Sequence, residues 1–209
     1  MKSKTSIYEL LRLRSISPND PEAEKIDPSE VCSFSGYRPS KLPFRWDKRD
    51  GGYRKVREMI REEIVLFAES GVHFFQTGMA RGIDLLCGEL VLELRKKYPI
   101  NLTCVVPCIN QCMGWGAEDQ ETYFRLIKAA TNVVQVTGES YSNGCMLKRD
   151  RYLVDTAQYM IAVFDGKKGG TMFTINYARQ QKRTIIVLNP SDHSRTELVH
   201  GNEEGVLYV

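Results

Sequence analysis

Residues 159–190 read YMIAVFDGKKGGTMFTINYARQQKRTIIVLNP, and this stretch decides the fold class. It begins with an apolar run at 159–166 and ends with a second at 183–190, and each run predicts a strand. Residues 170–182 between them predict a helix that follows two glycines. A strand, a helix and a second strand in this order predict two parallel strands joined by a crossover helix.

The same alternation runs through the chain before this stretch. Further strands are predicted by apolar runs at 31–36, 72–78, 100–107 and 132–138. Helical patterns fall at 53–71, 82–99, 117–130 and 145–157. The strands are nearly continuous runs of Val, Ile and Phe, which is typical of strands buried on both faces. The sequence therefore predicts an α/β fold with a mostly parallel sheet of about six strands and helices on both faces.

Composition limits the class of protein. The chain has 209 residues, of which 42% are hydrophobic, so a sizeable core is expected. The net charge of +3 gives no argument for a nucleic-acid partner. No apolar run approaches the roughly 18 residues that span a bilayer, and the N-terminal residues lack the apolar core of a signal peptide. We expect a cytoplasmic protein without a membrane partner, with an N-terminal extension (1–30), one domain (31–190) and a C-terminal tail (191–209).

Six cysteines are present, and three of them lie close together in the sequence. Cys104, Cys108 and Cys112 are spaced four residues apart and could form a metal site, but zinc sites usually need a fourth ligand besides pairs two to four residues apart. Cys104 lies inside a predicted strand, which favours a place in the core. We therefore expect no metal site and no disulfide framework.

Ligands of parallel sheets bind at the carboxyl ends of the strands, so the residues after each strand are candidates. The first strand ends at Ser35 and Gly36, and Arg38 follows; this pattern suits a ligand phosphate or carboxylate, or simply a tight turn with a solvated arginine. After the second strand come Thr77, Gly78, Met79, Gly82 and Asp84, listed here in chain order. Asp84 has the place of a helix cap or of an acceptor for a ribose hydroxyl.

The later strand ends add cations, hydroxyls and an aromatic side chain. Trp115 could cover a base or could pack on a neighbouring helix. Lys148, Arg149 and Arg151 begin a helix, where cations oppose the helix dipole, which suggests a bound anion, a paired carboxylate or a solvated basic face.

The glycine-rich segment after the fifth strand contains Asp165, Gly169, Gly170, Thr171 and Thr174. It suits a phosphate held by backbone N–H groups, or a glycine turn with a threonine cap. The segment lacks the spacing and the lysine of a P-loop, so nucleoside triphosphate hydrolysis is not expected.

Three blocks in this order, SGYRPSKL, TGMARGIDLLCGE and RDRYLVDTAQYMIAVFDGKKGGTMFTINYA, resemble the YpsA/YoqJ-like family of the SLOG superfamily. The resemblance covers residues 31–190 and extends to DprA and to the LOG phosphoribohydrolases. It implies a Rossmann-like fold that binds a nucleotide or a nucleotide derivative at the strand ends. By this resemblance TGMARGID corresponds to an anion-contacting block of DprA, and GGT to the phosphate loop of LOG enzymes.

LOG enzymes split a nucleoside monophosphate into base and ribose phosphate, with a glutamate shortly after the glycine loop and an arginine in a preceding helix. Arg149 or Arg151 could match that arginine, but no glutamate follows Thr171 at the expected place. Asp84, Glu89 or Asp165 are the carboxylates that could replace it.

Three functions follow from these observations. The first is a sensor or carrier of a nucleotide-derived ligand such as ADP-ribose or NAD, which the missing glutamate favours. The second is a hydrolase of nucleotide N-glycosidic bonds. The third is DprA-like binding of single-stranded DNA, which would need a basic groove with aromatic platforms. We expect no required cofactor apart from a bound nucleotide, and the resemblance allows a homo-oligomer.

Overall fold

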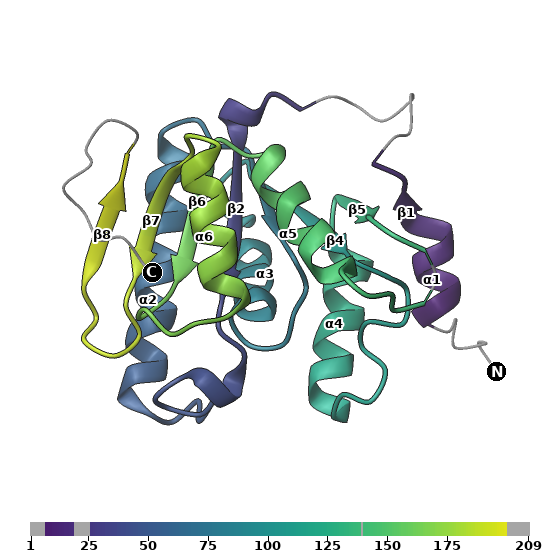
Figure 1. The fold of residues 1–209 in the computed structure, drawn as a ribbon, viewed down its shortest axis with the longest axis horizontal. Coiled ribbons are helices and arrows are strands. Elements are labelled where there is room, and N and C mark those ends of the chain that lie inside the picture. Colours follow the sequence, from purple (N-terminus) through teal and green to yellow (C-terminus); the bar gives the residue numbers. More distant parts are fainter. Residues whose placement is uncertain (1–6, 19–25, 139, 200–209) are drawn as a thin grey trace.

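The computed structural model describes residues 7–18, 26–138 and 140–199. Its centre is an eight-stranded sheet with the order β1-β5-β4-β3-β2-β6-β7-β8, in which only β8 runs antiparallel (Figure 1). The strands are β1 (Ser15–Ile16), β2 (Val31–Gly36), β3 (Phe74–Thr77), β4 (Asn101–Val106), β5 (Asn132–Gln135), β6 (Tyr159–Val163), β7 (Thr184–Leu188) and β8 (Arg195–Leu198).

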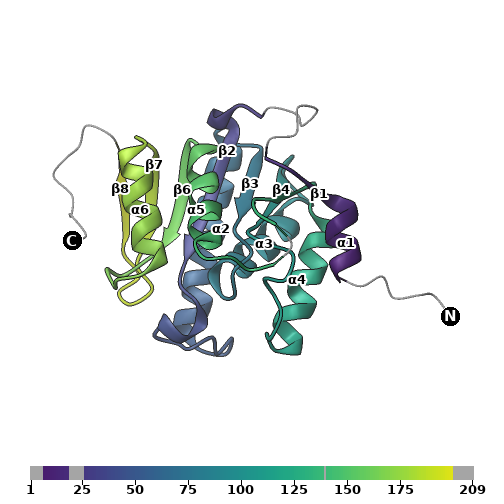
Figure 2. The ribbon, with the colours of Figure 1, turned by 45° about the vertical axis from the view of Figure 1, so that its right-hand side comes forward.

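Two groups of helices cover the sheet (Figure 2). The helices are α1 (Ile7–Arg14), α2 (Gly51–Glu69), α3 (Ile83–Leu94), α4 (Ala117–Ala129), α5 (Cys145–Asp155) and α6 (Gly170–Gln180). Helices α1 to α4 pack in one group, and α5 packs against α6 in the other. The crossovers through α2, α3 and α4 run along the sheet in one direction, and those through α5 and α6 run in the other. Because crossovers are right-handed, the two sets of helices lie on opposite faces.

The direction of the chain reverses at β2. Strands β3, β4 and β5 follow each other on one side of β2, whereas β6 and β7 lie on its other side. The adjacent carboxyl ends of β2 and β6 are in register, with Gly36 opposite Val163. This is the topological switch point, where sheets of this type bind ligands.

Local sequence explains why α2 begins and packs where it does. Asp50 accepts a hydrogen bond from the Gly52 amide at 2.7 Å and so caps the helix, which begins two residues before the expected position. Val56, Ile60 and Ile64, spaced four residues apart, are fully buried. The helical spacing in the sequence therefore marks the face that packs on the sheet.

The predicted α/β fold with a mostly parallel sheet is confirmed, but the sheet has eight strands instead of about six. Both additional strands come from outside residues 31–190. The two residues of β1 pair with β5, and β8 pairs with β7 as an exposed edge. Such short or polar strands carry no apolar alternation, so the sequence pattern does not indicate them. The division at residues 30 and 190 stays a prediction; residues 1–6, 19–25 and 200–209 lie outside the described structure.

The N-terminal helix is tied to the domain by Arg14. Its Nη1 donates to the carbonyls of Ile127 and Lys128, each at 2.6 Å, and its Nη2 donates to that of Ala130 at 2.7 Å. These carbonyls belong to the last turn of α4, whose C-terminal oxygens need partners. Leu11, one turn earlier in α1, is fully buried. In the residues described, no helix is long and apolar enough to cross a membrane.

We expect that Leu11→Ala lowers the free energy of unfolding by about 2–4 kcal/mol, because it removes a fully buried side chain and leaves a cavity. Urea denaturation measures the change. Leu66→Ala on α2, where the side chain is 56% exposed, is the matched control and should change the stability by less than about 1 kcal/mol. An unchanged midpoint for Leu11→Ala would show that α1 does not belong to the cooperative unit.

Candidate functional site

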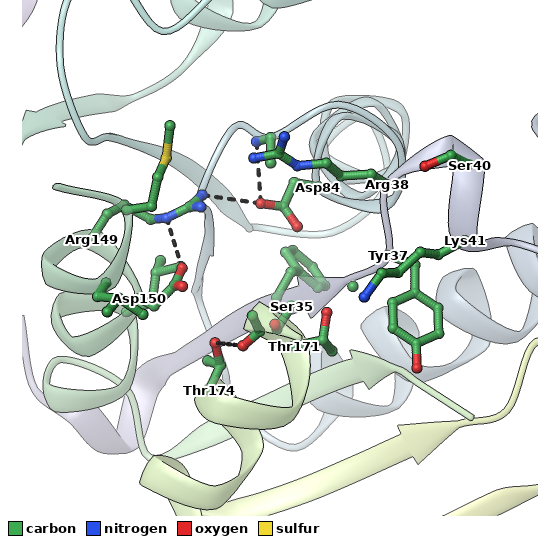
Figure 3. Close-up of a pocket in the computed structure, with 17 residues that line it drawn as sticks. Ser35, Tyr37, Arg38, Ser40, Lys41, Asp84, Arg149, Asp150, Thr171 and Thr174 are labelled. Carbon is green, nitrogen blue, oxygen red and sulfur yellow. Dashed lines mark hydrogen bonds and ion pairs between the residues drawn. The ribbon is translucent and has the colours of Figure 1, made fainter. Parts of the chain in front are cut away.

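A pocket of about 300 Å³ opens at the switch point (Figure 3). Four segments form its walls: the end of β2 with the loop after it, the turn between β3 and α3, and the first turns of α5 and of α6. These segments are far apart in the sequence, and the sheet order brings them together. The pocket therefore lies where the fold predicts a ligand.

An arginine between two carboxylates forms one side of the pocket. Arg149 Nη1 lies 3.2 Å from Asp84 Oδ2, and Arg149 Nε lies 2.9 Å from Asp150 Oδ1 as an ion pair without hydrogen-bond geometry. The side chains of Arg149 and Asp84 are only 6% and 7% exposed. Arg149 also donates to the carbonyl of Gly78. A Cβ at Gly78 would overlap the guanidinium, so a larger residue there would force Arg149 to move.

Burial decides the protonation behaviour of both acids. Burial raises the pKa of Asp84 to about 6, although Arg149 and the Ala80 amide both favour its ionised form. Burial also raises the pKa of Asp150, against the effect of Arg149. Two carboxylates thus share one guanidinium in a poorly solvated place, which makes each of them more basic than usual.

The turn before α3 holds Asp84 in place through a local network. Thr77 Oγ1 donates to the Asp84 carbonyl at 2.7 Å and accepts from the Met79 amide at 3.3 Å. Met79 is fully buried in the left-handed region with φ 58°, a conformation that is rare outside glycine. Gln111 donates to the Met79 carbonyl at 3.1 Å. The strained turn is therefore fixed from two sides, as is common at functional sites.

The opposite side of the pocket is the N-terminus of α6. The helix begins after Gly169, which has φ 153°, and within the described structure no side chain caps it. A Cβ at Gly170 would meet nothing within 4 Å. Ser35 and Thr171 are 9% and 8% exposed, both line the pocket, and no hydrogen bond to either hydroxyl is found among the described residues. Ser35 and Thr171 thus lie beside the uncapped start of α6 (Figure 3), where the first backbone N–H groups of a helix have no partner within the helix.

Two cations lie at the mouth of the pocket. Arg38 is exposed and near enough to Asp84 and Asp150 to favour their ionised forms. Lys41 Nζ donates to the Lys168 carbonyl at 2.6 Å, beside the glycine loop. The pocket therefore has one side with two carboxylates and another with hydroxyls and the start of a helix, and cations stand at its entrance.

The structure separates the predicted ligand-binding residues into two groups. Eight line the pocket: Ser35, Gly36, Arg38, Asp84, Arg149, Gly170, Thr171 and Thr174. Six lie outside its lining: Thr77, Gly78, Met79, Gly82, Asp165 and Gly169. Several residues of the second group lie in turns and allow segments of backbone to approach each other closely. At Gly82, for example, a Cβ would lie 2.6 Å from the Tyr37 carbonyl oxygen.

Two of the three candidate acids, Glu89 and Asp165, lie outside the lining of the pocket. Glu89 forms an ion pair with Arg125 on the outer face of α3. Asp165 accepts from Tyr37 at 2.8 Å and from Lys167 at 2.6 Å, so its carboxylate is already engaged. Asp84 is the predicted acid that lines the pocket.

Sequence reasoning missed several lining residues. They include Ser40, Lys41, Ala80, Met146, Leu147 and Asp150. Asp150 follows Arg149 directly in the sequence, and this adjacent acid was the available signal. Both tryptophans pack on neighbouring helices. The ring centre of Trp115 lies 5.5 Å from that of Tyr123 in α4, edge to face, and that of Trp46 lies 5.3 Å from that of Tyr53 in α2.

All six cysteines are buried and unpaired, and Cys104 lies in the core as expected. Burial raises the pKa of Cys108 to about 11, which makes this thiol unreactive at neutral pH. Over the described parts of the chain, no group of three or more His, Cys, Asp or Glu side chains is arranged to hold a metal ion.

Comparison with known proteins finds a family model that matches most of the chain. The model of the YspA SLOG family (YpsA) matches residues 32–190. A UPF0398 protein of Brevibacillus brevis is 25% identical over 139 residues, which cover 66% of this chain and 73% of that protein. The SPbeta prophage-derived protein YoqJ of Bacillus subtilis is 31% identical over 127 residues, which cover 55% of this chain and 74% of that protein.

Two solved structures share the fold. DNA processing protein A of Helicobacter pylori, described for its single-stranded DNA binding mode, superposes with a TM-score of 0.54 at 15% identity, over 77% of this chain and 65% of that one. DprA of Streptococcus pneumoniae superposes with a TM-score of 0.51 at 13% identity, over 75% of this chain and 49% of that one. This chain thus spans less than two thirds of each DprA chain.

The raised pKa of Asp84 gives a test of its buried position. In the unfolded chain the carboxyl ionises near its ordinary pKa of 3.8, but in the folded protein it ionises only near 6. The folded state therefore binds more protons between these values, and the wild-type free energy of unfolding falls as the pH rises.

We expect the stability of Asp84→Asn relative to wild type to increase by roughly 2–3 kcal/mol between pH 4 and pH 7. Urea denaturation at one-unit pH intervals measures this difference. The effect of Arg149 is already contained in the folded-state pKa of about 6, and the asparagine does not titrate in this range. A difference that stays constant from pH 4 to pH 7 would contradict the buried, poorly solvated position of the carboxyl.

Proposed function

Because this chain belongs to the YspA SLOG family, we propose that its pocket binds a nucleotide-derived ligand as a sensor or carrier. The ligand phosphate lies at the N-terminus of α6. Its ribose lies against Asp84 and Asp150. ADP-ribose, NAD and adenosine 5′-monophosphate (AMP) all combine these two groups.

The observation that carries the proposal is the pair of hydroxyls of Ser35 and Thr171. Neither hydroxyl has a hydrogen-bond partner among the described residues, so each is available to donate to a ligand in the pocket. Both hydroxyls point into a pocket whose wall is the uncapped start of α6 (Figure 3). A phosphate would accept from both hydroxyls and from the backbone N–H groups of Gly170 and Thr171.

The carboxylate side supports a ribose. Each acid uses one oxygen on Arg149, through Asp84 Oδ2 and Asp150 Oδ1. No hydrogen bond to Asp84 Oδ1 or Asp150 Oδ2 is found in the described structure. Two free carboxylate oxygens suit hydrogen-bond donors such as the hydroxyls of a sugar, and they would repel a second anion. The volume of about 300 Å³ suits one nucleotide unit, such as AMP or the AMP half of ADP-ribose or NAD.

Hydrolysis of the N-glycosidic bond is the second candidate. It is favoured by one observation, the pKa of Asp84 near 6, which suits a general acid at neutral pH. Against it, Asp84 Oδ2 already binds the Ala80 amide and Arg149. LOG enzymes have a glutamate shortly after the glycine loop, but residues 172–176 of this chain contain none. We therefore favour binding without cleavage.

Single-stranded DNA is a further ligand to be tested, because the Helicobacter pylori neighbour is described as binding it. The sequence favours a small molecule over nucleic acid as the partner, and this neighbour weakens that expectation. A strand of DNA lacks the ribose 2′-hydroxyl that is proposed to donate a hydrogen bond to the two carboxylates, so we expect it to bind more weakly than AMP.

We expect AMP or ADP-ribose at a hundred times its dissociation constant to stabilise the wild-type protein by about 2.7 kcal/mol. Gly170→Glu should reduce the affinity at least tenfold, because it places a carboxylate where the phosphate binds. Gly116→Glu is the matched control: Gly116 precedes α4, lies outside the pocket, and has open space around its Cβ position. Titration calorimetry and thermal unfolding measure both effects.

Each mixture is then separated by chromatography. Intact AMP after prolonged incubation supports binding alone, whereas free adenine with ribose 5-phosphate would establish the hydrolase instead. A labelled single-stranded oligonucleotide that binds more tightly than AMP, and is lost in Gly170→Glu, would replace the nucleotide with nucleic acid. If none of these ligands binds, the proposed function is wrong.

A further inference from the structure

We propose that Tyr37 is a positioning residue for the phosphate loop, defined here as residues 165–169, and that its hydroxyl sets the affinity for the ligand phosphate. This inference rests on the proposed function. It concerns a side chain whose hydroxyl does not point into the pocket but away from it (Figure 3). The phosphate loop leads directly into Gly170 and Thr171, whose N–H groups are proposed to hold the phosphate.

The Tyr37 hydroxyl is bonded to both ends of a short stretch of the loop. It donates to Asp165 Oδ1 at 2.8 Å and accepts from the Lys167 amide at 3.0 Å. The Asp165 amide lies at 3.5 Å as a longer contact. The residue is only 2% exposed, and its ring packs at 5.6 Å against Phe164, the residue before the loop. One phenol thus fixes the path of the backbone as it leaves β6.

Asp165 is held in the state that this arrangement needs. Burial alone would raise the pKa of Asp165, but hydrogen bonds from Lys167, Tyr37 and Ser191 outweigh it and lower the pKa. The carboxyl is therefore ionised at neutral pH and accepts from all three donors. Its Oδ2 receives Lys167 Nζ at 2.6 Å and Ser191 Oγ at 3.0 Å. We call these hydrogen bonds of Tyr37 and Asp165 the clamp, and through Ser191 the clamp extends to the loop between β7 and β8.

The same tyrosine also contacts the other side of the pocket. Its backbone carbonyl accepts from the Ile83 amide at 3.3 Å, at the start of the helix that carries Asp84. Lys41 Nζ lies 5.7 Å from the centre of its ring, at cation–π distance, and holds the Lys168 carbonyl. Three loops of the pocket edge therefore meet at one residue.

The phosphate loop has little stiffness of its own. Gly166 and Gly169 have φ values of 94° and 153°, and glycine is the residue with the greatest backbone freedom. A binding group has to be held within about 0.5 Å of its productive position. Without the phenol, the Lys167 amide loses its partner and the loop gains other paths. The N–H groups of Gly170 and Thr171 then no longer point together toward the phosphate, while Asp84 and Asp150 keep their positions.

The test is Tyr37→Phe, which removes the hydroxyl and keeps the buried ring. The control is Tyr177→Phe, because the Tyr177 hydroxyl makes the same kind of bond, to Asp155 Oδ1 at 2.9 Å, on a part of α6 outside the pocket. Calorimetry with AMP, and competition of adenosine against AMP, separate phosphate binding from binding of the nucleoside. Hydrogen exchange of the Lys167 to Thr171 amides reports the order of the loop directly.

For Tyr37→Phe we expect AMP affinity to fall at least tenfold, adenosine affinity to change less than twofold, and exchange at Lys167 to Thr171 to accelerate at least tenfold. Tyr177→Phe should match wild type in all three. AMP affinity within twofold of wild type would overturn the inference, and so would equal losses for AMP and adenosine, which indicate general distortion. If wild type itself fails to bind AMP, the proposed function is wrong and the role of the clamp in binding falls with it.

Discussion

The ion pair between Arg149 and Asp84 joins the two helical layers of the protein at the edge of the sheet. Asp84 belongs to α3 on one face, and Arg149 belongs to α5 on the other. The guanidinium reaches across the end of β3 through the space that Gly78 leaves by having no Cβ. Removing one partner of a buried ion pair costs about 3–5 kcal/mol when the other charge is left unpaired. Loss of Arg149 would leave Asp84 in that state, whereas Arg149 also pairs with Asp150. The geometry of the pocket depends on this one crossing.

Around that crossing the pocket is divided by charge. Two carboxylates with raised pKa values stand on one side, and hydroxyls and helix N–H groups stand on the other. Such a division suits a ligand with hydrogen-bond donors at one end and an anion at the other, as in a ribose phosphate. Tyr37 lies between the two sides and is bonded to both. Recognition of the sugar and of the phosphate therefore depends on different bonds, which are linked through one residue.

Some of this protein could be predicted from local patterns. Helices α2 to α6 and strands β2 to β7 follow from apolar spacing, because a helix repeats every 3.6 residues and a buried strand is a continuous apolar run. The pocket edge followed from the rule that parallel strands point their carboxyl ends to one side. Strands β1 and β8 were missed, since the first has two residues and the second has a polar, exposed pattern. These two segments are strands because they pair with β5 and β7, not because their own sequences show a strand pattern.

By itself, the sequence determined the α/β class, the order of the elements, the glycines that open the turns, and eight residues of the pocket lining. The tertiary structure alone decided which acid lines the pocket, because Asp84, Glu89 and Asp165 are equally polar in the sequence but meet different partners. It also decided the roles of Asp150 and of Tyr37, whose partner Asp165 is 128 residues away. Periodicity is a local property of the chain, whereas burial, pKa and hydrogen-bond partners come from contacts between distant segments.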